Sequence, residues 1–234
     1  MTVKQIMVEL ESRGSENIRK IFLNHGIHEP LFGVKIEDLK TIQKKIKTDY
    51  GLAKELYATG NADAMYLAGL IADDEKMTVA DLRSWVKQAV SQNISEYTVP
   101  WVAAGSHHGY ALALEWIDAG EEHIAAAGWS TLGMVMALKN DKELDLVHIK
   151  SLLQRVAKNI SRANNRVRHT MNGFVIAAGT YVSPLYVEAM TTAKTISSLT
   201  AEQNVKTARI PDAGSYLLKA KEKGLGKKKK TVKC

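Results

Sequence analysis

The sequence predicts an all-α protein built from short helices. Apolar residues recur at three- and four-residue spacing along nearly the whole chain of 234 residues, which is the pattern of helices with one buried face. The alternation of β-branched residues that marks strands is scarce, and only four prolines interrupt the chain. The joints between the periodic segments are short and rich in Gly or Asp, as at Gly60-Asn61, Asp73-Asp74, Gly105-Ser106 and Gly120.

The first half of the chain predicts five helices in order. The two opening helices are separated at Gly14. Before the fifth helix, Thr78-Val79-Ala80-Asp81 has the pattern of a capping box, in which the hydroxyl and the acid three positions later each bond a first-turn N–H. The apolar faces of these helices contain Ile6, Leu10, Ile18, Ile21, Phe22, Leu39, Ile42, Ile46, Leu52, Leu56, Tyr57, Leu82, Trp85, Val86 and Val90.

The second half continues the same periodicity. Ser183-Pro184 predicts a further helix start, with Ser at the cap and Pro in the first turn, where its missing N–H costs nothing. Three earlier helices of this half present apolar faces formed by Tyr110, Leu112, Leu114 and Ile117, then Leu132, Val135, Met136 and Leu138, then Leu146, Ile149, Leu152, Leu153 and Val156.

Pairs of such helices at a spacing of roughly 40 residues are typical of HEAT and armadillo arrays. An irregular helical bundle would show the same periodicity, so the spacing alone leaves both architectures open. Composition changes near Leu218, and we expect one domain over residues 1–218 followed by a basic tail over residues 219–234. The tail is of low complexity, and we expect it to be mobile.

The net charge of +7 and the pI of about 9.3 suggest a partner that carries negative charge. Residues 219–234 contain eight lysines and one glutamate, so the tail accounts for the whole net charge and the body is neutral. No apolar run is long enough to span a membrane, and the first residues lack the design of a signal peptide. The single cysteine, Cys234, allows no intrachain disulfide. We expect a cytoplasmic protein that does not bind membranes.

Charge is unevenly distributed within the neutral body. Residues 88–138 contain no Lys or Arg, and residues 148–187 contain no Asp or Glu. Cations without nearby acids can hold DNA phosphates, although a charge run is also the usual pattern of a solvated helix face. Lys227, Lys228, Lys229 and Lys230 would add nonspecific, salt-sensitive affinity or would merely keep the tail solvated. The DNA-binding candidates of the basic stretch are Arg155, Lys158 and Arg162, which share a face by their spacing, and Arg166 and Arg168, which follow a break.

Several segments resemble the AlkD-like DNA alkylation repair family, the alkylpurine DNA glycosylases built from HEAT-like repeats. The resemblance is carried by Phe32 to Lys40, Leu52 to Tyr57, Ala68 to Asp73, Trp85-Val86-Lys87 and Val167 to Val175. It implies a HEAT-like solenoid whose concave cleft holds double-stranded DNA. It also implies removal of N3- or N7-alkylated purines without a cofactor.

The family places two tryptophans and an aspartate beside the sugar of the lesion. By the resemblance, the first tryptophan corresponds to Tyr97, the aspartate to Trp101 and the second tryptophan to Gly173, or to Phe174 if the register slips by one. The usual catalytic aspartate is therefore replaced, and the nearest carboxylate is Glu96. Glu96 is the candidate catalytic residue, and a solvated first-turn glutamate is the alternative.

Aromatic residues are concentrated in the region where the family has its cleft. Tyr97, Trp101, Trp116 and Trp129 would suit a cationic base, but Trp116 and Trp129 would equally suit packing between repeats. His107, His108, His123 and His169 lack the spacing of a metal site, so we expect no bound metal.

These observations predict a monomeric DNA-binding protein, and whether it also excises alkylated purines stays open because the aspartate is replaced. One alternative is a non-catalytic helical scaffold that binds protein partners. Another is a protein that binds branched or altered DNA. A nuclease or other hydrolase is a weaker possibility, because no paired carboxylates are evident.

Overall fold

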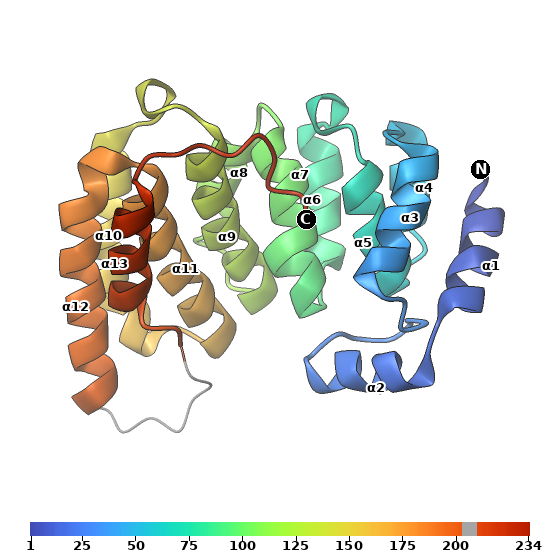
Figure 1. The fold of residues 1–234 in the computed structure, drawn as a ribbon, viewed down its shortest axis with the longest axis horizontal. Coiled ribbons are helices and arrows are strands. Elements are labelled where there is room, and N and C mark those ends of the chain that lie inside the picture. Colours follow the sequence, from blue (N-terminus) through green and yellow to red (C-terminus); the bar gives the residue numbers. More distant parts are fainter. Residues whose placement is uncertain (203–209) are drawn as a thin grey trace. The chain divides into compact units, whose positions relative to one another are not determined.

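The computed structural model describes residues 1–202 and 210–234, and within these ranges all regular structure is helical (Figure 1). The predicted all-α class is confirmed. The chain forms two compact units. Unit 1 contains Met1–His108 together with Lys233–Cys234, and unit 2 contains Gly109–Val232. Among the described residues, no helix combines the length and the apolar character that crossing a membrane requires.

Unit 1 is organised around one helix that is buried over its whole length. All ten residues of α5 are buried, which explains why this segment is apolar all round instead of amphipathic. Helices α3, α4 and α7 pack against α5, and α6 packs against α7. The elements are α1 (Val3–Arg13), α2 (Glu16–Asn24), α3 (Ile36–Ile46), α4 (Tyr50–Tyr57), α5 (Ala62–Ile71), η1 (Asp74–Lys76), α6 (Val79–Gln88), η2 (Ile94–Thr98) and α7 (Val99–Gly105).

Unit 2 continues with longer helices around a core that includes Trp129 and Phe174, whose rings meet edge to face at 5.2 Å. Its elements are α8 (Gly109–Trp116), α9 (Glu122–Leu138), η3 (Asp141–Glu143), α10 (Leu146–Asn159), η4 (Ile160–Arg162), α11 (Asn165–Tyr181), η5 (Ser183–Leu185), α12 (Tyr186–Glu202) and α13 (Ala213–Lys223).

The order of helix contacts follows the scheme of stacked hairpins. In unit 2, α8 packs on α9 and α10 packs on α11, while α9 also lies against α11 and α10 against α12. Each helix thus meets its chain neighbour within a hairpin and the next helix but one in the following repeat. This two-layer pattern is the one expected of HEAT-like repeats.

The predicted capping box is present at the start of α6. Thr78 Oγ1 accepts a hydrogen bond from Asp81 N, and the Asp81 carboxylate accepts one from Thr78 N. The helix predicted at Ser183-Pro184 starts differently. A 3-10 turn covers Ser183–Leu185, and α12 begins only at Tyr186.

Helix α7 is entered through a π turn, which the sequence did not reveal. Ile94–Thr98 form this turn, and Thr98 makes no side-chain cap bond but continues directly into α7. Pro100 lies within the first two positions of α7. Proline clashes with the carbonyl four residues earlier in a regular helix, so the wider turn, which is found frequently at functional sites, accommodates it.

The basic tail differs from the mobile segment that its composition suggests. Helix α13 extends to Lys223, beyond the expected end of the body. Within unit 2, Lys228 Nζ lies 2.8 Å from Asp141 Oδ1 and also donates to the carbonyl of Met136. Within unit 1, Lys233 Nζ lies 2.7 Å from Asp74 Oδ1 and donates to the carbonyl of Ala72. Partly buried carboxylates therefore fix the tail.

Candidate nucleic-acid interface

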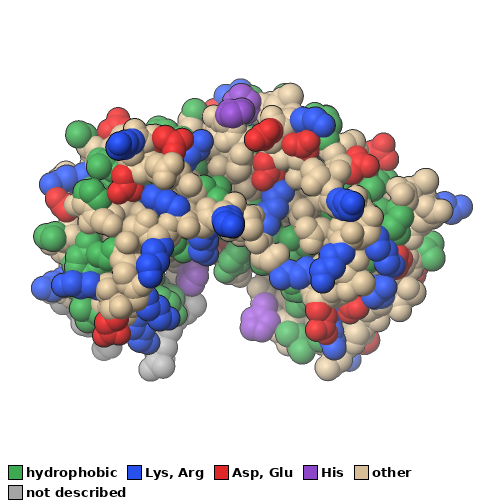
Figure 2. Space-filling model, turned by 45° about the horizontal axis from the view of Figure 1, so that its top comes forward, with side chains coloured by type: hydrophobic (Ala, Val, Ile, Leu, Met, Phe, Trp, Pro, Cys, Tyr) green, Lys and Arg blue, Asp and Glu red, His purple; other side chains and the backbone are tan. Residues whose placement is uncertain are grey.

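The basic stretch of unit 2 lies on α10, η4 and the start of α11. Lys158 is in the last turn of α10, and Arg162 ends the 3-10 turn η4. Both side chains are exposed, and among the described residues neither has an ion-pair partner. The connection between α10 and α11 therefore presents two cations that a phosphate can reach. Lys and Arg side chains are interspersed with Asp and Glu over the surface in Figure 2.

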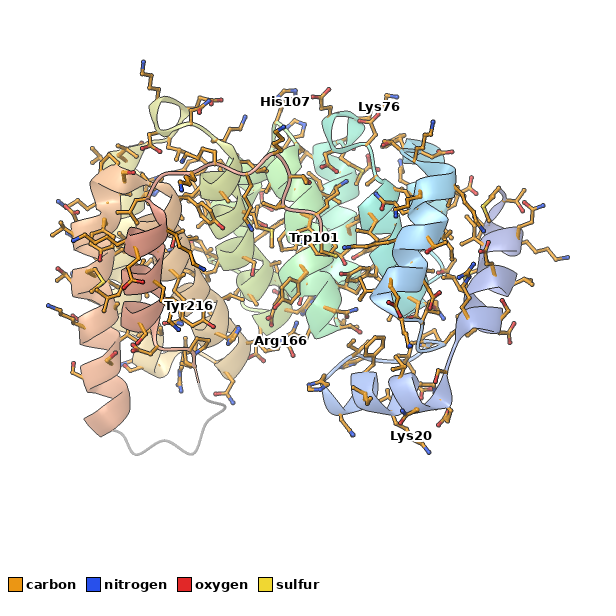
Figure 3. The ribbon with its side chains drawn as sticks, in the orientation of Figure 1. Lys20, Lys76, Trp101, His107, Arg166 and Tyr216 are labelled. Atoms are coloured by element: carbon orange, nitrogen blue, oxygen red, sulfur yellow. The ribbon has the colours of Figure 1, made fainter. Side chains whose placement is uncertain are left out.

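Arg155 and Arg166, by contrast, contact acids from the preceding part of the chain. Arg155 Nη2 lies 2.5 Å from Asp118 Oδ1, and its guanidinium lies over the Trp129 ring at 5.7 Å. Arg166, at the start of α11 (Figure 3), donates its backbone N–H to Glu122 Oε1 at 3.0 Å. The acids that residues 148–187 lack are thus supplied by residues 88–138, the segment without Lys or Arg.

Arg168 is used to close the connection between α10 and α11. Its guanidinium donates hydrogen bonds to the backbone carbonyls of Ile160, Ser161 and Ala163. These carbonyls belong to the end of a helix and the loop after it, where backbone acceptors lack helical partners. Arg168 therefore fixes the backbone that carries Arg162.

The four tail lysines have different surroundings. Lys228 is tied to Asp141, as described above. Lys227 Nζ donates to the carbonyl of Lys223, and Lys229 Nζ lies over the Tyr181 ring at 5.7 Å. Lys230 is exposed. The tail is thus not a uniform cationic arm.

Unit 1 contains a pocket of about 340 Å³ with mainly apolar walls. The apolar walls come from α2, α3 and the loop between them. We call this cavity the unit 1 pocket. Its aromatic and polar lining consists of Asp63, Tyr66, Asn93, Tyr97, Trp101 and Cys234.

Tyr97 and Trp101, two of the aromatic residues named in the sequence analysis, both line this pocket. Their ring centroids are 6.4 Å apart, and Trp101 also meets Tyr66 edge to face at 5.1 Å. Trp101 is buried, whereas Tyr97 is 46% exposed. Burial raises the pKa of Tyr97, and the Glu96 charge raises it further. Both tyrosines of the pocket therefore stay protonated near neutral pH, because burial and the Cys234 thiol also raise the pKa of Tyr66.

Glu96 is not the solvated first-turn glutamate of the alternative interpretation. Glu96 lies in the π turn and is only 3% exposed. Gln92 Nε2 donates to its Oε2 at 3.3 Å. A carboxylate in such surroundings is held by protein partners, and a substrate would have to displace them.

Asp63 is a pocket residue that sequence reasoning missed. Its carboxylate accepts hydrogen bonds from the backbone N–H groups of Phe32, Gly33 and Val34 at 2.6, 3.0 and 3.1 Å. Burial raises the pKa of Asp63, and these three donors oppose the shift. Gly33 has a φ of 77°, and a Cβ there would lie 2.5 Å from Arg19 N. The Phe32-Gly33-Val34 pattern could have indicated a tight loop, but no local signal identifies its anchor on α5.

Trp116 and Trp129 belong to unit 2, and they are 2% and 0% exposed. Trp129 belongs to the core cluster of that unit, where its ring meets Phe174. A bound base could touch either ring only if the surrounding helices separated. Among the described residues, the histidines highlighted by the sequence join no group of three or more potential metal ligands.

Comparison with known proteins matches the whole described architecture. The sequence family described as DNA alkylation repair enzyme matches residues 6–217. An uncharacterised protein of Listeria innocua is 30% identical over 229 residues, which cover 95% of this chain and 99% of that protein. An uncharacterised protein of Listeria monocytogenes shows the same identity and coverage.

A solved structure described as "a new family of proteins related to the HEAT-like repeat DNA glycosylases with affinity for branched DNA structures" is also similar. It is 34% identical and covers 100% of both chains with a TM-score of 0.89. The predicted HEAT-like architecture is thereby confirmed. The chain belongs to the DNA alkylation repair family.

Proposed function

We propose that this protein binds DNA at branched or otherwise structurally altered sites and does so without excising a base. The observation that carries the proposal is the full-length similarity, at a TM-score of 0.89, to a protein described as having affinity for branched DNA structures. The similarity covers 100% of both chains, so it includes both compact units and the basic tail.

The site chemistry supports binding more than bond cleavage. Trp101 stands where the resemblance would place the aspartate, and the nearest carboxylate, Glu96, is 3% exposed. Cleavage of a glycosidic bond needs a carboxylate close to the sugar, where positive charge develops. Binding needs only cations that can reach phosphates.

Lys158 and Arg162 are the cations that we assign to the phosphates. They are exposed on adjoining elements, whereas Arg155 is bound to Asp118 and Arg168 to backbone carbonyls. An exposed Arg without an acid can form two parallel hydrogen bonds with one phosphate.

The test is a salt titration of affinity for a four-way junction with the double variant Lys158→Ala, Arg162→Ala. Each lost phosphate contact should lower the slope of log K against log salt by roughly 0.9, so we expect a decrease of roughly two for the pair. The matched control is Lys142→Ala, Lys194→Ala, which removes the same charge from two other exposed positions of unit 2. Equal slopes for the two double variants would contradict the assignment.

A further inference from the structure

We propose that the unit 1 pocket binds one unpaired DNA base, the kind of base that becomes available where strands branch. This inference rests on the proposed function and extends it from the phosphates to the bases. It assigns a role to Asn93 and Tyr97 that requires no chemistry on the base.

The dimensions and walls of the pocket suit a planar heterocycle. Its volume of about 340 Å³ lies at the lower end of the range for small-molecule sites, which starts at roughly 300 Å³. Tyr66, Tyr97 and Trp101 supply aromatic surface to the lining. Tyr97 is half exposed, so its ring can be covered by a ligand. Stacking on aromatic side chains is the usual way in which proteins hold unpaired bases.

Asn93 gives the pocket a hydrogen-bonding group that lacks a partner. Its side chain lines the pocket, and among the described residues its buried Oδ1 atom has no hydrogen-bond donor. A buried acceptor without a donor is rare in native proteins and costs free energy. An exocyclic amino group of a base, such as that of adenine, is a donor of the required kind. A purely apolar ligand would leave the oxygen unsatisfied.

Two other polar groups of the pocket already have partners. The Asp63 carboxylate already accepts three backbone N–H groups, and Tyr66 Oη lies 2.9 Å from Cys234 Sγ. The Lys233–Asp74 ion pair holds the end of the chain at this position. Asn93 is therefore the group that would discriminate one base from another.

Cations adjoin the pocket along α3. Ile36 lines the pocket, and Lys40 lies four positions later on the same face of α3. Lys47 is the residue that directly follows the helix. Among the described residues, neither lysine has an ion-pair partner. A base in the pocket brings its own phosphates with it, and these lysines provide charge complementarity beside the apolar wall.

The experiment compares two branched DNAs that differ in a single nucleobase. In the first DNA an unpaired adenine lies at the branch, and in the second the same nucleotide lacks its base. We expect the wild-type protein to bind the first DNA roughly tenfold more tightly, as one stacked and hydrogen-bonded base should contribute. In Asn93→Leu and in Tyr97→Ala this ratio should fall toward one.

The control is Tyr216→Ala, which removes a tyrosine of similar exposure (54% against 46%) from α13. It should leave the ratio unchanged. Asn93→Leu removes an unpaired acceptor and should fold normally, which urea unfolding checks. Tyr97→Ala is an independent second variant at a half-exposed position.

A wild-type ratio near one, or a tenfold ratio that survives both variants, would overturn the pocket assignment. The preference for junction over unbranched duplex is measured separately with the wild-type protein. If the wild-type protein prefers the junction but binds both branched DNAs equally well, only the assignment of the pocket is refuted. If the wild-type protein does not prefer the junction over the duplex, the proposed function is refuted.

Discussion

Three carboxylates of unit 1 are held by different partners, and the partners set their pKa values in different directions. Burial acts to raise the pKa of Asp81, but hydrogen bonds from Lys54, Tyr50 and Thr78 outweigh it and the pKa is lowered. Burial raises the pKa of Asp74 to about 6, although the Lys233 ammonium opposes the shift. Asp63 is also raised, because three backbone donors only partly offset its burial.

The Asp74–Lys233 pair predicts that attachment of the chain end depends on pH. The groups that act on Asp74 are Lys233, Asp73 and Glu75. Asp74 also packs against Gly105 of α7, which keeps its carboxylate buried when the chain end is released. Release then removes only the lowering effect of Lys233, so the pKa of Asp74 is higher in the released state than in the attached state. Attachment is then favoured at neutral pH and weakens as the pH falls through about 6. Hydrogen exchange of the peptide covering residues 231–234, corrected for intrinsic rates, should accelerate below pH 6.

Two variants check this prediction. Lys233→Ala should show fast exchange at every pH, and Asp74→Asn should lose the pH dependence. Lys230→Ala removes a neighbouring exposed lysine and should behave like the wild type. A wild-type exchange rate that stays constant between pH 5 and pH 8 after correction would show that the Asp74–Lys233 pair does not control attachment of the chain end.

Residue roles that depend on local spacing could be predicted from the sequence, and roles that depend on distant partners could not. The capping box of Thr78 and Asp81 spans four residues and is present as predicted. Residues 148–187 contain no acid of their own, but helix packing brings Asp118 to Arg155, so the basic stretch is not free of acids in space. Lys233 forms an ion pair with Asp74, which lies 159 residues earlier in the sequence. The composition of the tail could not predict this pairing.

At the scale of elements, helix α5 and the π turn η2 are in close contact where Gly69 of α5 faces Thr98 of η2. A Cβ at Gly69 of α5 would lie 2.4 Å from Thr98 Cγ2. Thr98 is fully buried and branched at Cβ, so it has little freedom to move aside. The absence of a side chain at Gly69 therefore lets η2, which contains the pocket residue Tyr97, approach α5. In α11, by contrast, a Cβ at Gly173 would meet no atom within 4 Å.

These two glycines predict opposite stability changes for the same substitution. Gly69→Ala should destabilise the protein by about 1–3 kcal/mol, because the added methyl group overfills a close contact. Gly173→Ala should stabilise it by about 0.5–1 kcal/mol, because alanine restricts the unfolded chain and fits the helix interior. Urea unfolding of both variants measures the difference. Stabilisation by both substitutions would show that the α5–η2 contact is not close in solution.

Helix periodicity and joint composition were enough to predict the class of the elements but not the entry into α7. Pro100 lies in the first turn of α7, and Thr98, a residue type that often caps helices, is itself helical and ends a π turn. A π turn depends on tertiary packing and leaves no periodic signal. The apolar residues of α5 indicated a buried helix only through the family resemblance, because their periodicity does not favour one face.

At the scale of the whole molecule, formal charge is a poor guide to the binding surface. The tail accounts for the net charge of +7, yet Lys228 and Lys233 are each paired with an aspartate. The exposed cations of the neutral body, at the end of α10 and along α3, have more freedom to contact phosphates. Position and pairing of the lysines therefore matter more for the proposed function than their number.

The family could be inferred from short segments of sequence, whereas the DNA structure that is bound could not. Residues such as Leu39 and Gly69 serve the packing of the fold and carry no information about the DNA ligand. The choice between excision and binding depends on a few positions around Glu96 and Trp101. The proposal of branched DNA therefore depends on the full-length similarity to a solved relative.

The most direct test of the account is an equilibrium competition at near-physiological salt. A labelled four-way junction bound to the wild-type protein is challenged with an unlabelled linear duplex of the same length and base composition. The account predicts that the duplex competes at least tenfold less well than an unlabelled junction. Equal competition by the duplex and the junction would contradict it.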